Sequence, residues 1–195
     1  DKEDGIFMKI TKQKIKLLCP QLIFLIVTFC IFMPSSLFLG NIDEFAVGFA
    51  ALIPLLMAAS LITAAVVILI GLIVPKKICN IYAAVIFGGA LAAYVQGNFL
   101  NPDFGVLNGR QIQWSQFRVN AIISTVLWIV LIVVPAVVVC FKKDIMTKIM
   151  KWGSLFLSSI QVVTLVVLIV SSKRSVDYSY AVSYTHLRAH ETRSN

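Results

Sequence analysis

The chain has 195 residues, of which 59% are hydrophobic and 13% charged, and its mean hydropathy is +0.91. A soluble domain carries about 25% charged residues, so this composition excludes a disordered chain, an acidic tail and an ordinary cytosolic enzyme. The net charge of +8 comes from short basic clusters between long apolar runs, which is typical of a membrane protein and argues against nucleic acid as a partner. We therefore expect an all-α, polytopic membrane protein.

Five apolar runs are long enough for membrane helices, each of which needs about 20 predominantly apolar residues to cross a core about 30 Å thick. Together they form one membrane domain over residues 17–172. In chain order the predicted spans cover about residues 17–39, 45–74, 78–95, 119–141 and 152–170.

Local features refine the first three spans. The first follows a basic segment over residues 1–16 and is longer than the apolar part of a cleaved signal peptide, which predicts a retained signal anchor. The second is long enough to tilt, to kink at Pro54 or to lie partly in the interface. The third contains Gly88 and Gly89 followed by Ala90, small residues that allow a neighbouring helix to approach closely.

The spans carry few chemically reactive groups. No charged residue lies in the central part of any predicted span, which counts against a pump or an ion-coupled transporter. The four cysteines, at positions 19, 30, 79 and 140, have no metal-ligand spacing, so we expect neither disulfides nor a zinc site.

Lysines and arginines predict the orientation. They number five before the first span, then none, two, two and four in the successive connections. Because cytoplasmic segments carry the excess of basic residues, the N-terminus is predicted to be cytoplasmic. With five spans the C-terminus then lies outside, and residues 173–181 begin an exported region.

The connection over residues 142–151 reads KKDIMTKIMK. Its apolar residues recur at helical spacing, which predicts a short amphipathic turn on the inner membrane surface with lysines facing anionic head groups. Two interpretations stay open at this point, a lipid-substrate site and a plain interfacial connector.

The predicted external loop over residues 96–118 is rich in amides and turn signals. Asp103 stands alone, and Ser115 has no general base near it in the sequence, so acid–base and nucleophilic catalysis are not indicated. Five polar side chains are candidate contacts for a head group outside the membrane, the alternative being that they only satisfy the loop's own turns: Asn98, Asn101, Asp103, Asn108 and Arg110.

The C-terminal residues have a different character. Residues 182–192 resemble the translation of a transposase sequencing adapter, so we expect residues 182–195 to be an artefact and the authentic chain to stop near Tyr180. Both histidines, His186 and His190, lie in this segment. Their spacing would otherwise suggest a metal site, and we set it aside. At the other end, Met8 is a natural start.

A family resemblance is carried by the run AYVQGNFLNPDFGVLNGRQIQWSQF, which follows LIVPKKICNIYAAVIFG. These residues resemble the N-terminal membrane region of a clostridial family in which five membrane helices precede an extracellular sulfatase-like domain. That domain belongs to the alkaline-phosphatase superfamily and is related to lipoteichoic acid synthase. The resemblance covers about residues 9–175.

The resemblance implies a membrane anchor in a bacterial plasma membrane, cut off before its surface-facing catalytic domain. That domain would be a hydrolase or transferase acting on cell-envelope phosphate or sulfate esters, and a divalent metal is implied for it. The 195 residues themselves are expected to hold no catalytic, cofactor-binding or metal-binding residue. The implied partners are membrane lipids and a lipid-linked cell-envelope substrate. The alternative is a complete, non-enzymatic five-span protein, such as a transporter subunit or an assembly factor.

Overall fold

The structure is a computed structural model that describes residues 2–42, 45, 48–100 and 117–191, with side chains described for residues 8, 10–42, 45, 48–100 and 117–172. These residues contain no β-strand, and the all-α prediction is confirmed. The helices in chain order are α1 (Lys2–Leu25), η1 (Ile26–Phe32), α2 (Met33–Gly40), η3 (Phe49–Leu52), α3 (Ile53–Ile73), α4 (Lys76–Val95), η4 (Gln96–Leu100), α5 (Arg118–Phe141) and α6 (Lys143–Glu191).

Five helical stretches of this described part are long and apolar enough to cross a membrane, as the sequence predicts. They cover Ile10–Gly40, Phe49–Ile73, Lys76–Leu100, Arg118–Phe141 and Lys143–Ser172. The last stretch begins at Lys143, whereas the predicted span begins at residue 152. The segment 142–151 is therefore not a separate turn, because its residues from Lys143 onward form the first turns of α6.

Prolines shape the helices at two places. Pro54 lies in the first turn of α3, where a missing backbone N–H removes no helical hydrogen bond, so it starts this helix instead of kinking it. Pro34 follows the π-helix η1, whose wider turn is closed by a hydrogen bond from the Met33 N–H to the Thr28 carbonyl. We attribute the wider turn to the Pro34 ring, which would clash with the Cys30 carbonyl in a regular α-helix.

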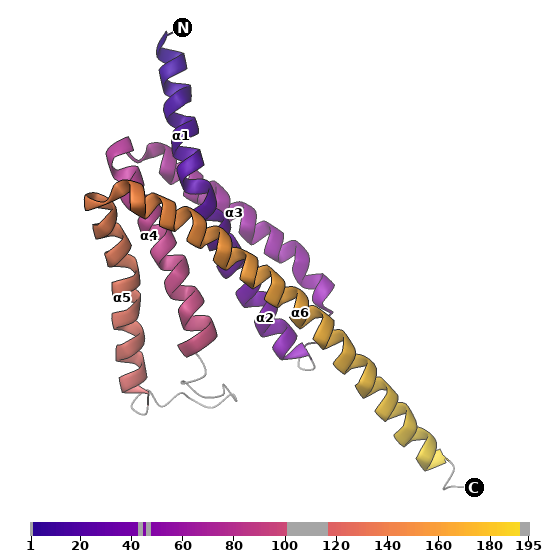
Figure 1. The fold of residues 1–195 in the computed structure, drawn as a ribbon. Helices are drawn as coiled ribbons and strands as arrows, with labels where there is room; N and C mark the ends of the chain where they lie inside the picture. Colours follow the sequence, from indigo (N-terminus) through magenta and orange to yellow (C-terminus); the bar gives the residue numbers. More distant parts are fainter. Residues whose placement is uncertain (1, 43–44, 46–47, 101–116, 192–195) are drawn as a thin grey trace.

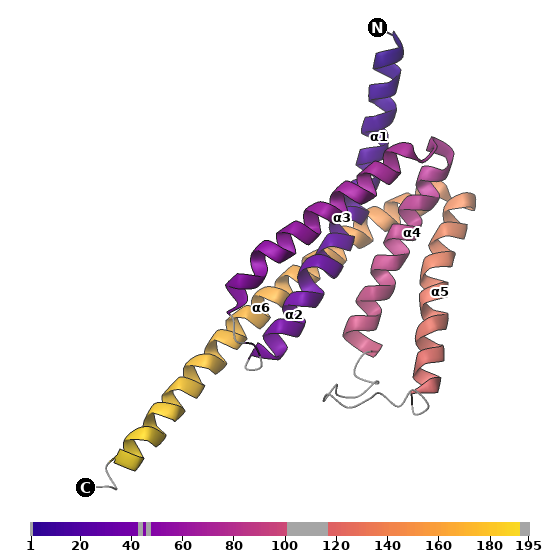
Figure 2. The ribbon, with the colours of Figure 1, turned by 180° about the vertical axis from the view of Figure 1, so that it is seen from behind.

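The helices gather into two connected groups (Figure 1). Helix α6 packs along α1, η1 and α2, and α4 and α5 form a closely packed antiparallel pair. Helix α4 also contacts α1 and α6, and it joins the two groups. The α3–α4 and α5–α6 junctions lie at the same end as the N-terminus, while the end of α2 and the C-terminus lie towards the other end (Figure 2).

The core lies where α1, α4 and α6 meet. Phe24 of α1 is fully buried, and its ring lies 6.1 Å from that of Phe87 and 6.4 Å from that of Tyr94, both on α4. Small residues of α4, among them Ala83, Ala84 and Ala90, are fully buried in this region. Gly88 meets the α5 backbone, so the predicted close approach of a neighbouring helix is confirmed at this residue, whereas Gly89 faces open space.

Lys14 closes the C-terminus of α3. Its Nζ donates hydrogen bonds to the carbonyl oxygens of Leu72 (2.8 Å) and Val74 (2.6 Å). These carbonyls lie at the negative end of the helix dipole, where a cation stabilises the helix by about 0.3–1 kcal/mol and up to about 2 kcal/mol when partly buried. The contact also ties α1 to α3.

We expect Lys14→Met to lower the free energy of unfolding by about 1 kcal/mol, because α3 loses this capping charge. Unfolding of the detergent-purified chain by a denaturing detergent, followed by circular dichroism, measures the loss. Lys12→Met is the matched control. It removes the same charge from the same helix, and Lys12 is exposed. Equal losses in the two variants would contradict the capping role.

Candidate functional site

The predicted external contacts fall largely outside the described residues. Asn98 is described. Its Nδ2 donates to the Tyr94 carbonyl one turn earlier (2.8 Å), and its side chain is exposed. The other four candidates, Asn101, Asp103, Asn108 and Arg110, lie in the segment 101–116 that the structure does not describe. Their contact with a head group stays a prediction.

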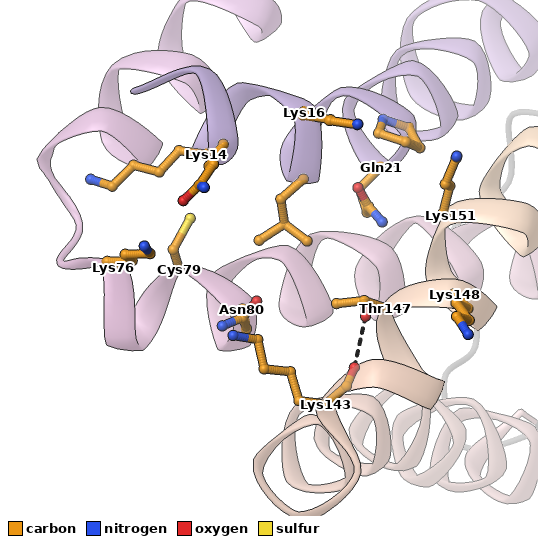
Figure 3. Close-up of a pocket in the computed structure, with 13 residues that line it drawn as sticks. Lys14, Lys16, Gln21, Lys76, Cys79, Asn80, Lys143, Thr147, Lys148 and Lys151 are labelled. Atoms are coloured by element: carbon orange, nitrogen blue, oxygen red, sulfur yellow. Dashed lines mark hydrogen bonds between the residues drawn. The ribbon is translucent and has the colours of Figure 1, made fainter. Parts of the chain in front are cut away.

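A pocket of about 380 Å³ lies at the lysine-rich end of the helices, between α1, the start of α4 and the start of α6 (Figure 3). We call it the basic pocket. It is lined by Gln13, Lys14, Lys16, Leu17, Pro20, Gln21, Lys76, Cys79, Asn80, Lys143, Thr147, Lys148 and Lys151.

The charge of the basic pocket is of one sign. Its lining holds six lysines and no aspartate or glutamate. Lys14 binds the end of α3, and Lys151 lies 5.0 Å from the centre of the Trp152 ring. In the described part of the chain, none of the six pairs with a carboxylate. Because the lining carries positive charge without a carboxylate among the described residues, the pocket favours anions.

Gln21 is the buried polar group of the basic pocket. Its side chain is 1% exposed, and neither Nε2 nor Oε1 has a hydrogen-bond partner among the described residues. Figure 3 shows its amide on the pocket side of α1, between Lys16 and Lys151. A buried amide without a partner costs about 1–3 kcal/mol, so this side chain lacks the partner that its burial calls for.

The first turns of α6 form one wall of the basic pocket because their residues separate onto different sides of the helix. Met146 and Met150, four residues apart, are buried in the core, whereas Ile145 and Ile149 are exposed. Burial of the two methionines leaves Thr147, Lys143, Lys148 and Lys151 to line the pocket. The segment 142–151 therefore supplies part of the lining of the basic pocket, and the choice between a lipid site and a plain connector stays a prediction.

The lining of the basic pocket offers few reactive side chains. Thr147 Oγ1 donates towards the Lys143 and Asp144 carbonyls (2.8 and 3.2 Å), so its hydroxyl is engaged within its own helix. Cys79 is buried and forms no disulfide. In the described ranges, no three His, Cys, Asp or Glu side chains lie close enough to hold a metal ion. What the lining offers is ammonium groups and amides, which bind anions.

A second polar feature lies between packed helices, and it was not predicted from the sequence. We call it the polar seam. It joins buried side chains of α1, η1 and α2 to buried side chains of α6: Gln21, Thr28, Ser35, Ser154, Ser158 and Gln161. The first three recur every seven residues within an apolar run, and this spacing is the signal that could have revealed them.

The centre of the polar seam is a pair of hydrogen bonds. Thr28 Oγ1 donates to Gln161 Oε1 (3.2 Å) and accepts from Gln161 Nε2 (3.0 Å). Both side chains are buried, so each supplies the other with a partner that the apolar surroundings lack. The seam thereby fixes how α6 lies against η1.

Comparisons with models of protein families, with curated proteins and with solved structures find no match to the chain. The described residues form an all-helical arrangement with five helices apolar enough to cross a membrane and a lysine-lined pocket at one end.

Proposed function

We propose that the chain is the membrane anchor of a surface-facing, sulfatase-like hydrolase or transferase. In this proposal five helices cross a bacterial plasma membrane with the lysine-rich end in the cytoplasm. The chain then emerges outside, where the catalytic domain acts on phosphate or sulfate esters of the cell envelope. The observation that carries the orientation in this proposal is the odd number of apolar helices in the described part of the chain, with lysines gathered at one end.

Membrane insertion is supported by the surface of the outer helices. In their most apolar stretches, only 11% of α3 and 17% of α5 is buried by the rest of the chain. Large side chains such as Leu61 and Val119 are about two-thirds exposed (68% and 67%). In water such a surface would aggregate, whereas lipid chains solvate it.

The orientation is supported by where the basic residues meet. Lys76 begins α4 and Lys143 begins α6, and both junctions lie at the end where α1 enters the bundle (Figures 1 and 2). Because basic residues flanking membrane helices are retained in the cytoplasm, this end is assigned to the inside. The helix order then carries the end of α6 outwards.

The enzymatic part of the proposal is supported by the family resemblance over about residues 9–175. The divalent metal implied by that family finds no ligand cluster in the described residues, so its ligands are assigned to the exported domain. In this arrangement the five membrane helices hold the exported domain close to the membrane, beside lipid-linked substrates.

The orientation is tested by cysteine labelling in intact cells, after replacement of the four native cysteines by alanine. We expect Asn108→Cys to react with a membrane-impermeant maleimide from outside. Asp144→Cys, at an exposed position in the first turn of α6, should react only after permeabilisation. Leu61→Cys is the control, since a thiol in the hydrocarbon region should stay unlabelled in both conditions. The reverse pattern would overturn the orientation and the export of the C-terminal region.

The enzymatic assignment has a separate test in the gene itself. We expect the reading frame beyond the codon for Tyr180 to encode an extracellular domain of several hundred residues, with the metal ligands of a sulfatase-like enzyme. A stop codon soon after Tyr180 would instead support the non-enzymatic alternative.

A further inference from the structure

We propose that the basic pocket binds the phosphate of an anionic phospholipid head group. The inference rests on the part of the proposed function that places the helices in a bilayer, and it goes beyond that function. In the proposed orientation the pocket faces the cytoplasmic leaflet, whereas the catalytic domain lies outside. The bound lipid is therefore a structural ligand of the anchor and not the substrate of the enzyme.

The depth of the basic pocket fits a head group. Lys76 and Lys143 are the first residues of α4 and α6, and both helices continue as apolar stretches that could cross the hydrocarbon core. Residues that begin such helices lie at the level of the phosphates. A lipid seated here can keep its acyl chains among those of the bilayer and place only its head group between the helices.

The charge of the basic pocket also fits a phosphate. Lys16, Lys76, Lys143, Lys148 and Lys151 are exposed at the opening, and the described residues offer them no carboxylate partner. Asp144 lies in the first turn of α6 but is not part of the lining. The first turns of α4 and α6 both line the pocket, and their free N–H groups add positive potential where they begin.

Gln21 distinguishes the basic pocket from a surface that only carries exposed lysines, because it adds a buried amide to the lining. Its buried amide has no partner for Nε2 or Oε1 in the described part of the chain. A phosphate oxygen, or a hydroxyl of the head group, would supply one. The volume of about 380 Å³ lies in the range of about 300–1,000 Å³ that is usual for small-ligand sites, and a glycerophosphate group fits within it.

The proposal is tested by native mass spectrometry of the full, detergent-purified chain with added dioleoylphosphatidylglycerol. Phosphatidylcholine is the zwitterionic comparison. The double variant Lys16→Gln/Lys148→Gln removes two lysines of the pocket, and Lys12→Gln/Lys142→Gln removes two lysines at the same end that do not line it. We expect the pocket variant to lose roughly 10- to 30-fold in affinity for the anionic lipid, and the control to lose less than about twofold. Equal losses would overturn the proposal, because they would indicate diffuse attraction to surface charge.

Gln21→Leu separates the proposal from a purely structural role of this side chain. We expect it to weaken phosphatidylglycerol binding about fivefold without any change of charge. Without lipid it should raise the unfolding midpoint, because it removes a buried amide that has no partner. A lower midpoint together with unchanged lipid binding would show Gln21 to be a structural residue and would overturn its place in the site.

The source of the phosphate is distinguished with sn-glycerol 3-phosphate in a detergent free of anionic lipid. We expect this soluble compound to bind far more weakly than phosphatidylglycerol, because it lacks the acyl chains that hold the head group at the pocket. Equal affinity would overturn the assignment to a lipid. These measurements are made in detergent and do not depend on orientation or on an exported domain, so their failure is distinguishable from failure of the proposed function.

Discussion

Replacing Gly88 by alanine is expected to destabilise the chain, while the same change at the next residue is not. A Cβ atom on Gly88 would overlap the carbonyl oxygen of Leu131 and lie 2.8 Å from the Cα of Ile132, both backbone atoms of α5. Because backbone cannot move aside as a flexible side chain can, α4 and α5 would have to separate. Overpacking of this kind costs about 1–3 kcal/mol, and we expect the upper end of that range.

Gly89→Ala is the matched control for this prediction. A Cβ on Gly89 meets nothing within 4 Å, and alanine favours the helix over glycine by about 0.8–1 kcal/mol. The two variants should therefore differ in sign, with Gly88→Ala unfolding earlier than the unmodified chain and Gly89→Ala at the same point or later. Denaturing-detergent titration followed by circular dichroism measures both. If Gly88→Ala were as stable as Gly89→Ala, the close approach of α5 at this residue would be refuted.

This pair of glycines shows which part of the helix packing can be predicted from the sequence and which part cannot. The small residues over positions 88–90 predicted a close helix neighbour, and the structure has one. They did not tell which glycine faces it, because both lie on the same helix and the choice depends on how α4 is rotated against α5. The number of apolar helices can be predicted more completely than their packing. Hydrocarbon thickness fixes the length of a span, and the apolar runs are visible in the sequence.

The basic pocket could not be predicted, although each of its lysines was noted. In the sequence these lysines indicate the orientation, and those of the segment 142–151 also indicate contact with anionic head groups. Neither property depends on the distances between lysines of different helices. Lys16, Lys76 and Lys148 come together only through the packing of α1, α4 and α6. For the segment 142–151, the helical spacing of its apolar residues was recognised. Burial of Met146 and Met150 against the core depends on tertiary contacts that no local pattern contains.

The polar seam differs from the basic pocket in that part of it is visible as a spacing in the sequence. Gln21, Thr28 and Ser35 are spaced by seven residues, which places them along one side of a helical stretch even through the π-helical turn of η1. In apolar surroundings such side chains favour contact with polar groups of a neighbouring helix. The pattern indicates a helix partner without identifying it, and in the structure Thr28 finds that partner in Gln161 of α6.

The hydrogen-bonded pair at the centre of the polar seam should behave as one unit on mutation. Thr28→Val leaves the buried Gln161 amide without its partner, and Gln161→Leu leaves the Thr28 hydroxyl without one. We expect each single variant to lower the free energy of unfolding by about 1–2 kcal/mol. The double variant should lose less than the sum, because the two apolar side chains leave no polar group stranded. Interhelical hydrogen bonds in membranes couple by about 0.6 kcal/mol on average and up to about 1.7 kcal/mol, and full burial places this pair near the upper value.

Thr164→Val provides the control for this double-mutant cycle. Thr164 lies on the same helix as Gln161, but it is exposed and its hydroxyl donates to the Ile160 carbonyl of its own helix (2.9 Å). Its replacement should change stability by less than about 0.5 kcal/mol and should be additive with Thr28→Val, since the two sites share no partner. The cycle is measured by denaturing-detergent unfolding of the four chains under one condition. Additive losses for Thr28→Val and Gln161→Leu would show that the two side chains do not support each other, and the packing of α6 against η1 would then rest on apolar contacts alone.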